Sequence, residues 1–291
     1  MKFGRRRYSR SRNDSSLKIR LLIGAAIILF SVISFLANTD VNPVTGEKQR
    51  VGGVTVQQEI ALGLHAAPEM ARRHGGFHPS ESERQLVEQV GLRLVNSLNR
   101  QLVTAGRSLP YQFQFHLLAD DRTVNAFALP GGQIFITYAL YSQFRKDGQI
   151  DVDLLAGVLG HEIGHVIERH GAEQMAKGKM FEGITNAAVV IGGNMESAQI
   201  TSFVTGFVGM KYSRQAELES DRWGVRLALD AGFRPQAMLE VMDILERSAG
   251  TGRPPEFVST HPSSETRKQE IRKFIEEIYT RDMVEYQAPQ W

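Results

Sequence analysis

The chain of 291 residues contains no cysteine, so it forms no disulfide bond and offers no thiol for lipid attachment. It has no internal repeat and no low-complexity block, and its formal net charge is only +2. With 42% hydrophobic and 23% charged residues, its composition is that of an ordinary globular protein. The length suits one domain of about 200 residues with appendages.

The small net charge conceals a basic N-terminus. The first 20 residues hold one acid, Asp14, against the basic residues Lys2, Arg5, Arg6, Arg7, Arg10, Arg12, Lys18 and Arg20. Such a run is typical of a nucleic-acid-binding arm. Here it precedes Leu21–Ala37, which is uncharged and mostly apolar. About 17 to 20 helical residues just span a hydrocarbon core, and a basic flank holds the N-terminus in the cytoplasm.

We therefore predict a cytoplasmic tail over residues 1–20 and a transmembrane anchor over 21–37, with no nucleic-acid partner. The competing interpretation is a cleaved signal peptide. Cleavage after Ala37 would need a small residue at position 35, where the chain has Phe35. The sequence thus favours an uncleaved anchor, a linker over 38–54 and a domain held outside the cytoplasmic membrane, in the periplasm of a bacterial-type envelope.

The segment His161-Glu162-Ile163-Gly164-His165 carries the strongest chemical signal in the chain. Residues four apart share a helix face, so His161 and His165 can present two imidazole nitrogens to one metal ion. Glu162 lies about a third of a turn away, where its carboxylate reaches water rather than the metal. The preceding residues 151–160 are apolar enough for a buried helix, and buried histidines need partners. We expect one zinc ion per chain to be that partner. The alternative is that this five-residue pattern occurs by chance on a helix with two ordinary histidines.

A catalytic zinc site needs a third protein ligand and an open fourth position. A second helix, capped by Ser213, is predicted downstream. On it Glu217 and Asp221 share a face, so Glu217 can bind the metal while Asp221 accepts the outer N–H of a ligand histidine. Periodicity alone also allows Glu219 as the ligand, and a solvated acidic face is the common alternative for such a run.

At this point the chain resembles the gluzincin metallopeptidases grouped with the CAAX prenyl protease and HtpX. The resemblance rests on residues 161–165, on Glu217 with Asp221, and on three further segments: residues 125–136, Lys211–Arg214, and Thr260-His261-Pro262 with Arg267. It spans about residues 55–278 and is nearest to single-domain bacterial members that are secreted or membrane-anchored. It implies Glu217, not Glu219, as third zinc ligand. Ser220 departs from the usual alanine.

The chemistry expected of such a site is hydrolysis by a metal-activated water. Glu162 would take the proton of the water and later deliver it to the leaving amine. The oxyanion needs a further donor, and the resemblance puts His261 near the metal, although it could simply precede a helix. Tyr212 is a weaker candidate donor. Arg267 could help to bind substrate or orient this region, or lie on an exposed helix face.

Substrate alignment is expected from residues 125–136. Phe113–Leu117, Ala126–Leu129 and Gln133–Thr137 are predicted strands, with a turn over Pro130–Gly132. An exposed edge strand pairs with an extended peptide, which makes Asn125, Ala126 and Phe127 candidate substrate-binding residues. An ordinary hairpin packed on helices explains Phe127 better.

The remaining chain is predicted to be mostly helical. Helices are expected over 56–74, 80–103 (with a Ser80/Glu83 capping box), 152–170, 235–247 and 262–279, with helices covering the cleft over 181–210 and a loose tail over 280–291. The other histidines, His170 among them, are assigned no role.

The predicted fold is a mainly helical α+β, zincin-like metallopeptidase domain over 55–279, with a small sheet beside the zinc helix and one transmembrane helix before it. The resemblance implies an endopeptidase for unfolded or membrane-associated proteins in envelope quality control. The alternative from another class is a chaperone-like binding protein that keeps a structural zinc, although a structural site needs no general base such as Glu162.

Overall fold

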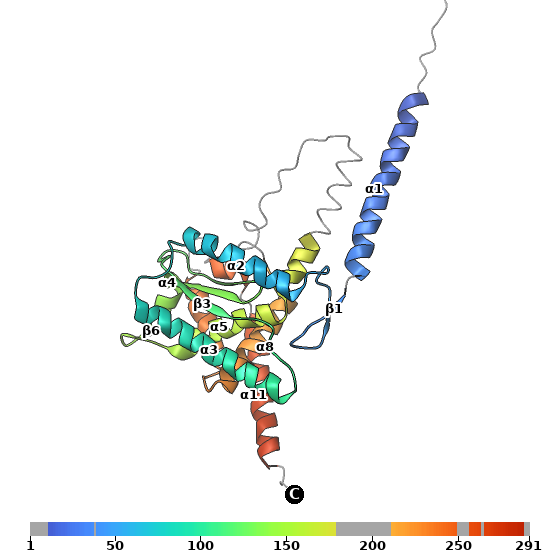
Figure 1. Cartoon of the computed structure of the whole chain (residues 1–291). Coiled ribbons are helices and arrows are strands. Elements are labelled where there is room, and N and C mark those ends of the chain that lie inside the picture. Colours follow the sequence, from blue (N-terminus) through green and yellow to red (C-terminus); the bar gives the residue numbers. More distant parts are fainter. Residues whose placement is uncertain (1–10, 38, 179–210, 249–255, 263–264, 288–291) are drawn as a thin grey trace, which may run out of the picture. The chain divides into compact units, whose positions relative to one another are not determined.

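The computed structural model describes residues 11–37, 39–178, 211–248, 256–262 and 265–287 (Figure 1). It divides into two compact units. Unit 1 comprises residues 1–40, 48–53 and 173–200; unit 2 comprises 41–47, 54–172 and 201–291. The helices expected over 181–210 lie outside the described residues.

Unit 1 contains one long apolar helix. Helix α1 spans Ser11–Ala37, so it begins within the predicted basic tail. Its part Lys18–Ala37 is long and apolar enough to cross a membrane, by length and composition. Large apolar side chains such as Leu22 and Phe30 are exposed along it. Burying such side chains in a hydrocarbon phase is favourable, which is consistent with the predicted anchor.

Unit 2 is built on a three-stranded sheet. Strands β3 (Gln114–Leu118), β4 (Ala126–Leu129) and β5 (Gln133–Thr137) are arranged in the order β3-β5-β4, with β3 parallel and β4 antiparallel to β5. The predicted bounds of β4 and β5 are confirmed. The tight turn between them needs glycine, because Gly131 has φ 82° and a Cβ there would lie 2.4 Å from the Cα of Ile60.

Alternate residues of the sheet face opposite layers of helices, as the period of a strand requires. Phe127, Leu129 and Phe135 pack with apolar residues of α2 (Val56–Arg73). Ala126, Ile134 and Ile136 face the main core, which includes residues of α3 (Glu81–Thr104) and α5 (Val152–Ile167). The sheet is therefore covered on both faces (Figure 1).

The helix starts follow capping rules, with one difference from prediction. Thr55 and Gln58 form a complete capping box at the start of α2. At α3 the Ser80 hydroxyl accepts from the Glu83 N–H, whereas the Ser80 N–H donates to His78. The predicted box at Ser80 is therefore only half formed.

Short elements and C-terminal helices complete the description. They are β1 (Asp40–Val41), β2 (Lys48–Gln49), α4 (Tyr138–Tyr141), the 3-10 helix η1 (Ser142–Phe144), the hairpin of β6 (Arg145–Lys146) with β7 (Gln149–Ile150), α8 (Arg214–Asp230), α9 (Ala237–Ser248), α10 (Glu256–Thr260) and α11 (Glu265–Gln287). The expected loose tail from residue 280 is instead helical up to Gln287.

Helices α5 and α8 cross at small residues, which brings their backbones close together. A Cβ on Gly164 would lie 2.9 Å from the Cα of Ser220, and one on Gly160 would lie 3.0 Å from the Cα of Gly224. Every residue of α5 from Leu154 to Ile167 is buried. The crossing therefore presses the polar residues of the two helices against one another inside the core.

The predicted helix over 152–170 is interrupted. Helix α5 ends at Ile167, and Arg169 adopts φ 57°, a left-handed conformation unusual for a residue with a side chain. A new helical segment starts at His170 and runs to the end of the described stretch at residue 178. The break turns His170 back toward α8, which no helical period through 152–170 would do.

Candidate metal centre

The two histidines of α5 meet as their spacing predicts. Their Nε2 atoms lie 3.1 Å apart, and both side chains are buried. Two nitrogen ligands of one tetrahedral zinc ion, each about 2.05 Å from it, are roughly 3.3 Å apart. The separation of His161 and His165 is thus close to that of two ligands on one ion.

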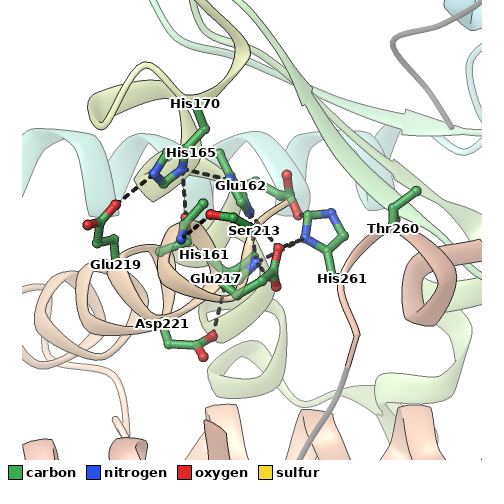
Figure 2. A network of polar contacts seen from close by, with 12 residues as sticks. His161, Glu162, His165, His170, Ser213, Glu217, Glu219, Asp221, Thr260 and His261 are labelled. Carbon is green, nitrogen blue, oxygen red and sulfur yellow. Dashed lines mark hydrogen bonds and ion pairs between the residues drawn. The ribbon is translucent and has the colours of Figure 1, made fainter. Parts of the chain in front are cut away.

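Two further side chains complete a compact donor set. Glu217, from the first turn of α8, has carboxylate oxygens 3.6 Å from His161 Nε2 and 3.6 Å from His165 Nε2. His261, just after α10, has its Nδ1 3.3 Å from His161 Nε2 and 3.0 Å from Glu217 Oε1. One donor atom from each of the four lies within 4.8 Å of the others, and all four residues are buried (Figure 2). This set can hold one metal ion.

Asp221 and Arg267 lie directly behind the donor set. The Nδ1 of His161 is 3.0 Å from Asp221 Oδ1, so the Asp221 carboxylate can accept its hydrogen. Arg267 donates to both oxygens of Asp221, at 2.7 and 2.6 Å, and its Nη1 lies 2.7 Å from Glu217 Oε2. Arg267 is only 2% exposed. Its guanidinium is engaged by carboxylates inside the protein, which agrees with the alternative that Arg267 orients this region.

Glu162 lies beside the donor set with a free oxygen. Its Oε1 has no hydrogen-bond partner among the described residues, and the nearest cation-forming group is His261 Nε2 at 3.7 Å. Burial raises the pKa of Glu162, although His261 and His161 oppose this shift. A buried carboxylate with a raised pKa and an unused oxygen is suited to accept a proton.

The pKa values of His165 and His261 are shifted in opposite directions. Burial and the neighbouring histidines lower the pKa of His165 well below its usual range, which favours the neutral ring that binds metals. Burial also opposes protonation of His261, but the carboxylates of Glu217 and Glu162 outweigh it and raise its pKa. Tyr212 stacks on His165 at 4.0 Å between ring centroids, and burial raises its pKa.

Strand β4 lies at an edge of the sheet next to α5. The carbonyls of Asn125 and Leu129 accept hydrogen bonds from the β5 side, from Thr137 and Gly132. Because backbone groups alternate along a strand, those of Ala126 and Ala128 point the other way, and the Ala128 amide contributes a hydrogen bond that stabilises the Glu162 carboxylate.

The three predicted substrate-binding residues therefore differ in placement. Ala126 points its backbone groups away from β5 and is 0% exposed. Asn125 is 1% exposed, and both polar atoms of its side chain lack partners among the described residues. The backbone groups of Phe127 point toward β5, and its ring stacks on Phe135 at 5.0 Å within the core, as the alternative of a hairpin packed on helices expects.

The sequence indicates no role for His170, and the resemblance favours Glu217 over Glu219 as a ligand. In the structure His170 is buried, 2.9 Å from His165 between their Nδ1 atoms, and its Nε2 is 3.0 Å from Glu219 Oε2. Glu219 is thus connected to the metal set only through His170. No pattern in the sequence marks this pair, because it depends on the break at Arg169.

The chain matches the model of peptidase family M48 over residues 81–275, more than half of its length. It therefore belongs to this family of peptidases. The expected fold class and the resemblance on which it rested are confirmed, and the family membership implies a metal cofactor, which the donor set could hold.

The chain is similar to proteases from bacteria and from mitochondria. The chain is 30% identical to the beta-barrel assembly-enhancing protease of Escherichia coli (strain K12) over 188 residues, which is 61% of this chain and 37% of that protein. It is 26% identical over 265 residues to the mitochondrial metalloendopeptidase OMA1 of Schizosaccharomyces pombe, 88% of this chain and 71% of that one. It is 30% identical over 177 residues to OMA1 of Saccharomyces cerevisiae, covering 58% and 49%. The chain thus spans little more than a third of the first of these relatives.

Proposed function

We propose that this protein is a zinc-dependent endopeptidase. The observation that carries the proposal is the buried set of His161, His165, Glu217 and His261 with the unpaired Glu162 oxygen beside it. Two imidazoles and one carboxylate are a common ligand set of catalytic zinc. Membership of a peptidase family and resemblance to two kinds of protease support the same conclusion.

His161, His165 and Glu217 would hold the zinc ion. Asp221 fixes the tautomer of His161 by accepting the Nδ1 hydrogen, and Arg267 keeps both Asp221 and Glu217 ionised within the core. When bound, zinc would supply Lewis-acid polarisation of water and of the scissile carbonyl. The residues around it thus fit the group that the family implies.

Glu162 is the proton carrier of the proposed reaction. Its Oε1 accepts a proton from the attacking water and then gives it to the nitrogen of the leaving amine. Its burial suits this function, because burial raises the pKa of Glu162 toward neutral pH. A group whose pKa lies near the working pH can both accept and donate a proton.

Substrate alignment is proposed to use the free side of β4. The outward backbone groups of Ala126 can pair with an extended peptide, as an added strand pairs with a sheet edge. The two unpartnered polar atoms of Asn125 can hydrogen-bond to a peptide group, which would remove the cost of leaving them buried and unpaired. Phe127 supports this strand from the core.

His261 has two states in this proposal. In the conformation described here its Nδ1 completes the donor set, whereas a catalytic zinc keeps one position open. Turnover therefore requires the ring to leave the set. It then remains near enough to donate a hydrogen bond to the oxyanion. His261→Ala is expected to retain the metal and to lower kcat about 100- to 1,000-fold; a rise in kcat would show that the ring only blocks the site.

The remaining features support a membrane-held enzyme. Helix α1 is proposed as an uncleaved anchor, with residues 1–20 cytoplasmic and the peptidase domain, residues 55–279, on the periplasmic side. Unfolded or membrane-associated envelope proteins are the proposed substrates, because an edge strand binds any extended backbone. The name of the Escherichia coli relative, an assembly-enhancing protease, supports a substrate among envelope proteins.

A casein-type assay on the full chain in detergent micelles tests the function. Cleavage should require zinc, stop with a chelator and return on adding zinc. Glu162→Gln should keep the fold and the zinc but lose nearly all cleavage, because an amide accepts no proton at this pH.

The set of four protein donors also favours one second function, a binding protein with a structural zinc and a blocked cleft. That function would replace the first if the wild type and His261→Ala both bound zinc but cleaved no unfolded protein.

A further inference from the structure

Two side chains outside the proposed metal set connect one of its histidines to a surface carboxylate. His170 is 3% exposed and begins the helical segment after the break at Arg169. Its Nδ1 is 2.9 Å from His165 Nδ1, and its Nε2 is 3.0 Å from Glu219 Oε2. Figure 2 shows the three residues in a row that leads away from the metal set.

The hydrogen-bond directions along this row follow from its outer end. An ionised carboxylate only accepts hydrogen bonds, so His170 Nε2 carries the hydrogen that it donates to Glu219. In its neutral form the His170 ring has only this one N–H, so its Nδ1 is then an acceptor. His165 Nδ1 must then be the donor at 2.9 Å. The hydroxyl of Ser220 lies 3.5 Å from the same His170 nitrogen. This distance is too long for a hydrogen bond that could compete with the one from His165.

The consequence falls on the inner nitrogen of His165. With its hydrogen on Nδ1, His165 has a lone pair on Nε2, the atom that lies 3.1 Å from His161 Nε2 and 3.6 Å from Glu217 Oε1. This is the tautomer that a metal ligand requires. The opposite tautomer would point an N–H into the metal set and could not bind the ion.

We propose that His170 and Glu219 are a positioning pair that fixes the tautomer and ring orientation of His165 and so sets the metal affinity of the site. The proposal rests on the metal site of the proposed function. It gives the two histidine ligands different supports: Asp221 acts on His161 directly, whereas Glu219 acts on His165 through the ring of His170.

The two supports also differ in their surroundings. The side chain of Asp221 is 2% exposed and is held by Arg267. That of Glu219 is 35% exposed and accepts a hydrogen bond from Gln215 on the same helix. Water and salt screen an exposed charge more than a buried one. Most of the orienting effect on His165 therefore comes from the buried His170 ring, and Glu219 fixes which nitrogen of that ring carries the hydrogen.

Paired substitutions of nearly equal shape separate this function from simple packing. His170→Asn keeps an acceptor close to the position of Nδ1, whereas His170→Leu has a similar shape and no acceptor. The zinc dissociation constant of the full chain in micelles is measured by competition with a chromogenic chelator. Loss of an outer hydrogen-bond partner typically weakens metal binding 10- to 100-fold. We expect that loss for His170→Leu and a loss within about threefold for His170→Asn.

His74→Leu is the matched control. His74 is also a buried histidine, 2.8 Å from the carboxylate of Asp120, and it contacts none of the proposed ligands. Its replacement should lower the urea midpoint of the metal-free protein without changing the zinc dissociation constant. A purely structural His170 would behave in the same way, with stability lowered by both His170 substitutions and zinc affinity unchanged.

The contribution of Glu219 is tested by a double-mutant cycle. Glu219→Met alone should weaken zinc binding severalfold, and the double substitution should be no weaker than His170→Leu alone, because Glu219 acts only through His170. Additive losses would overturn the ordered pair. A His170→Leu protein that binds zinc within threefold of the wild type would overturn the proposal as a whole. A wild type that binds no zinc at all would instead overturn the proposed function.

Discussion

Replacing Arg267 tests how the buried charges of the site are balanced. Arg267 is 2% exposed, and its guanidinium donates to both oxygens of Asp221 and contacts Glu217. Burial opposes ionisation of Asp221, yet Arg267 and the hydrogen bond with His161 keep the pKa of that carboxyl below its usual range. Arg267→Met fills similar space but leaves two buried carboxylates without this cation. Removing one partner of a buried ion pair costs about 3–5 kcal/mol.

Bound metal should reduce that cost. A zinc ion places positive charge next to Glu217, so the loss should be greatest in the metal-free protein and smaller when zinc is present. Urea unfolding of the full chain in micelles can be followed by the fluorescence of Trp223, whose indole donates to Glu168 at 2.6 Å. We expect a loss of about 3–5 kcal/mol without metal. Arg267→Lys should recover only part of it, because an ammonium cannot bind a carboxylate in the same two-pronged way.

Arg234→Met is the matched control for this measurement. Arg234 also contacts three carboxylates, those of Asp151, Asp153 and Glu240, but its side chain is 47% exposed. Exposed ion pairs contribute about 0–1 kcal/mol each, so its replacement should cost far less than that of Arg267. Equal losses of unfolding free energy for Arg267→Met and Arg234→Met would refute the view that burial makes the Arg267 ion pairs the more stabilising ones.

Two further predictions concern packing and pH. Gly164→Val should destabilise the protein by about 1–3 kcal/mol and weaken zinc binding, because its side chain would push α8 and Glu217 away from α5. Gly178→Val is its control, because no atom of the described residues lies within 4 Å of the new Cβ; equal losses of zinc affinity would contradict the crossing argument. Burial opposes ionisation of Asp120, but hydrogen bonds from Thr123, His74 and Arg122 lower its pKa to about 2. Its stabilisation, about 1 kcal/mol after allowance for solvent, is present above pH 4 and is lost between pH 4 and 2. Asp120→Asn should flatten this part of the stability profile measured by urea unfolding, and an unchanged profile would contradict the assignment.

The parts of the fold that local rules govern were predictable. Strands β4 and β5 have the predicted bounds because two short runs of mostly apolar residues flank a Pro-Gly-Gly turn. Helix α8 begins after Ser213, whose hydroxyl accepts from the Ala216 N–H at 3.2 Å. The meeting of His161 and His165 follows from the helical period alone.

Placements that depend on distant contacts were not predictable. Phe127 and Ala126 are neighbours in one strand, and only the pairing with β5 decides that the backbone groups of Phe127 point toward β5 while those of Ala126 point away from it. Arg267 could equally have lain on the exposed face of its helix. Its burial depends on α11 packing beside α8 and α9, where Ile271 and Ile275 join Val225 and Met242 in one apolar cluster.

The break at Arg169 shows why a helical period alone misplaced His170. A left-handed residue with a side chain costs free energy and persists only where its surroundings fix it. Here the Arg169 guanidinium is fully buried and donates to Glu59 Oε1 at 2.7 Å and to the Val54 carbonyl at 2.6 Å. Those partners are more than 100 residues earlier in the chain. Continuing α5 through Arg169 would carry this side chain away from them and leave Glu59 buried without its cation. The ion pair therefore favours the turn, and the turn brings His170 against His165.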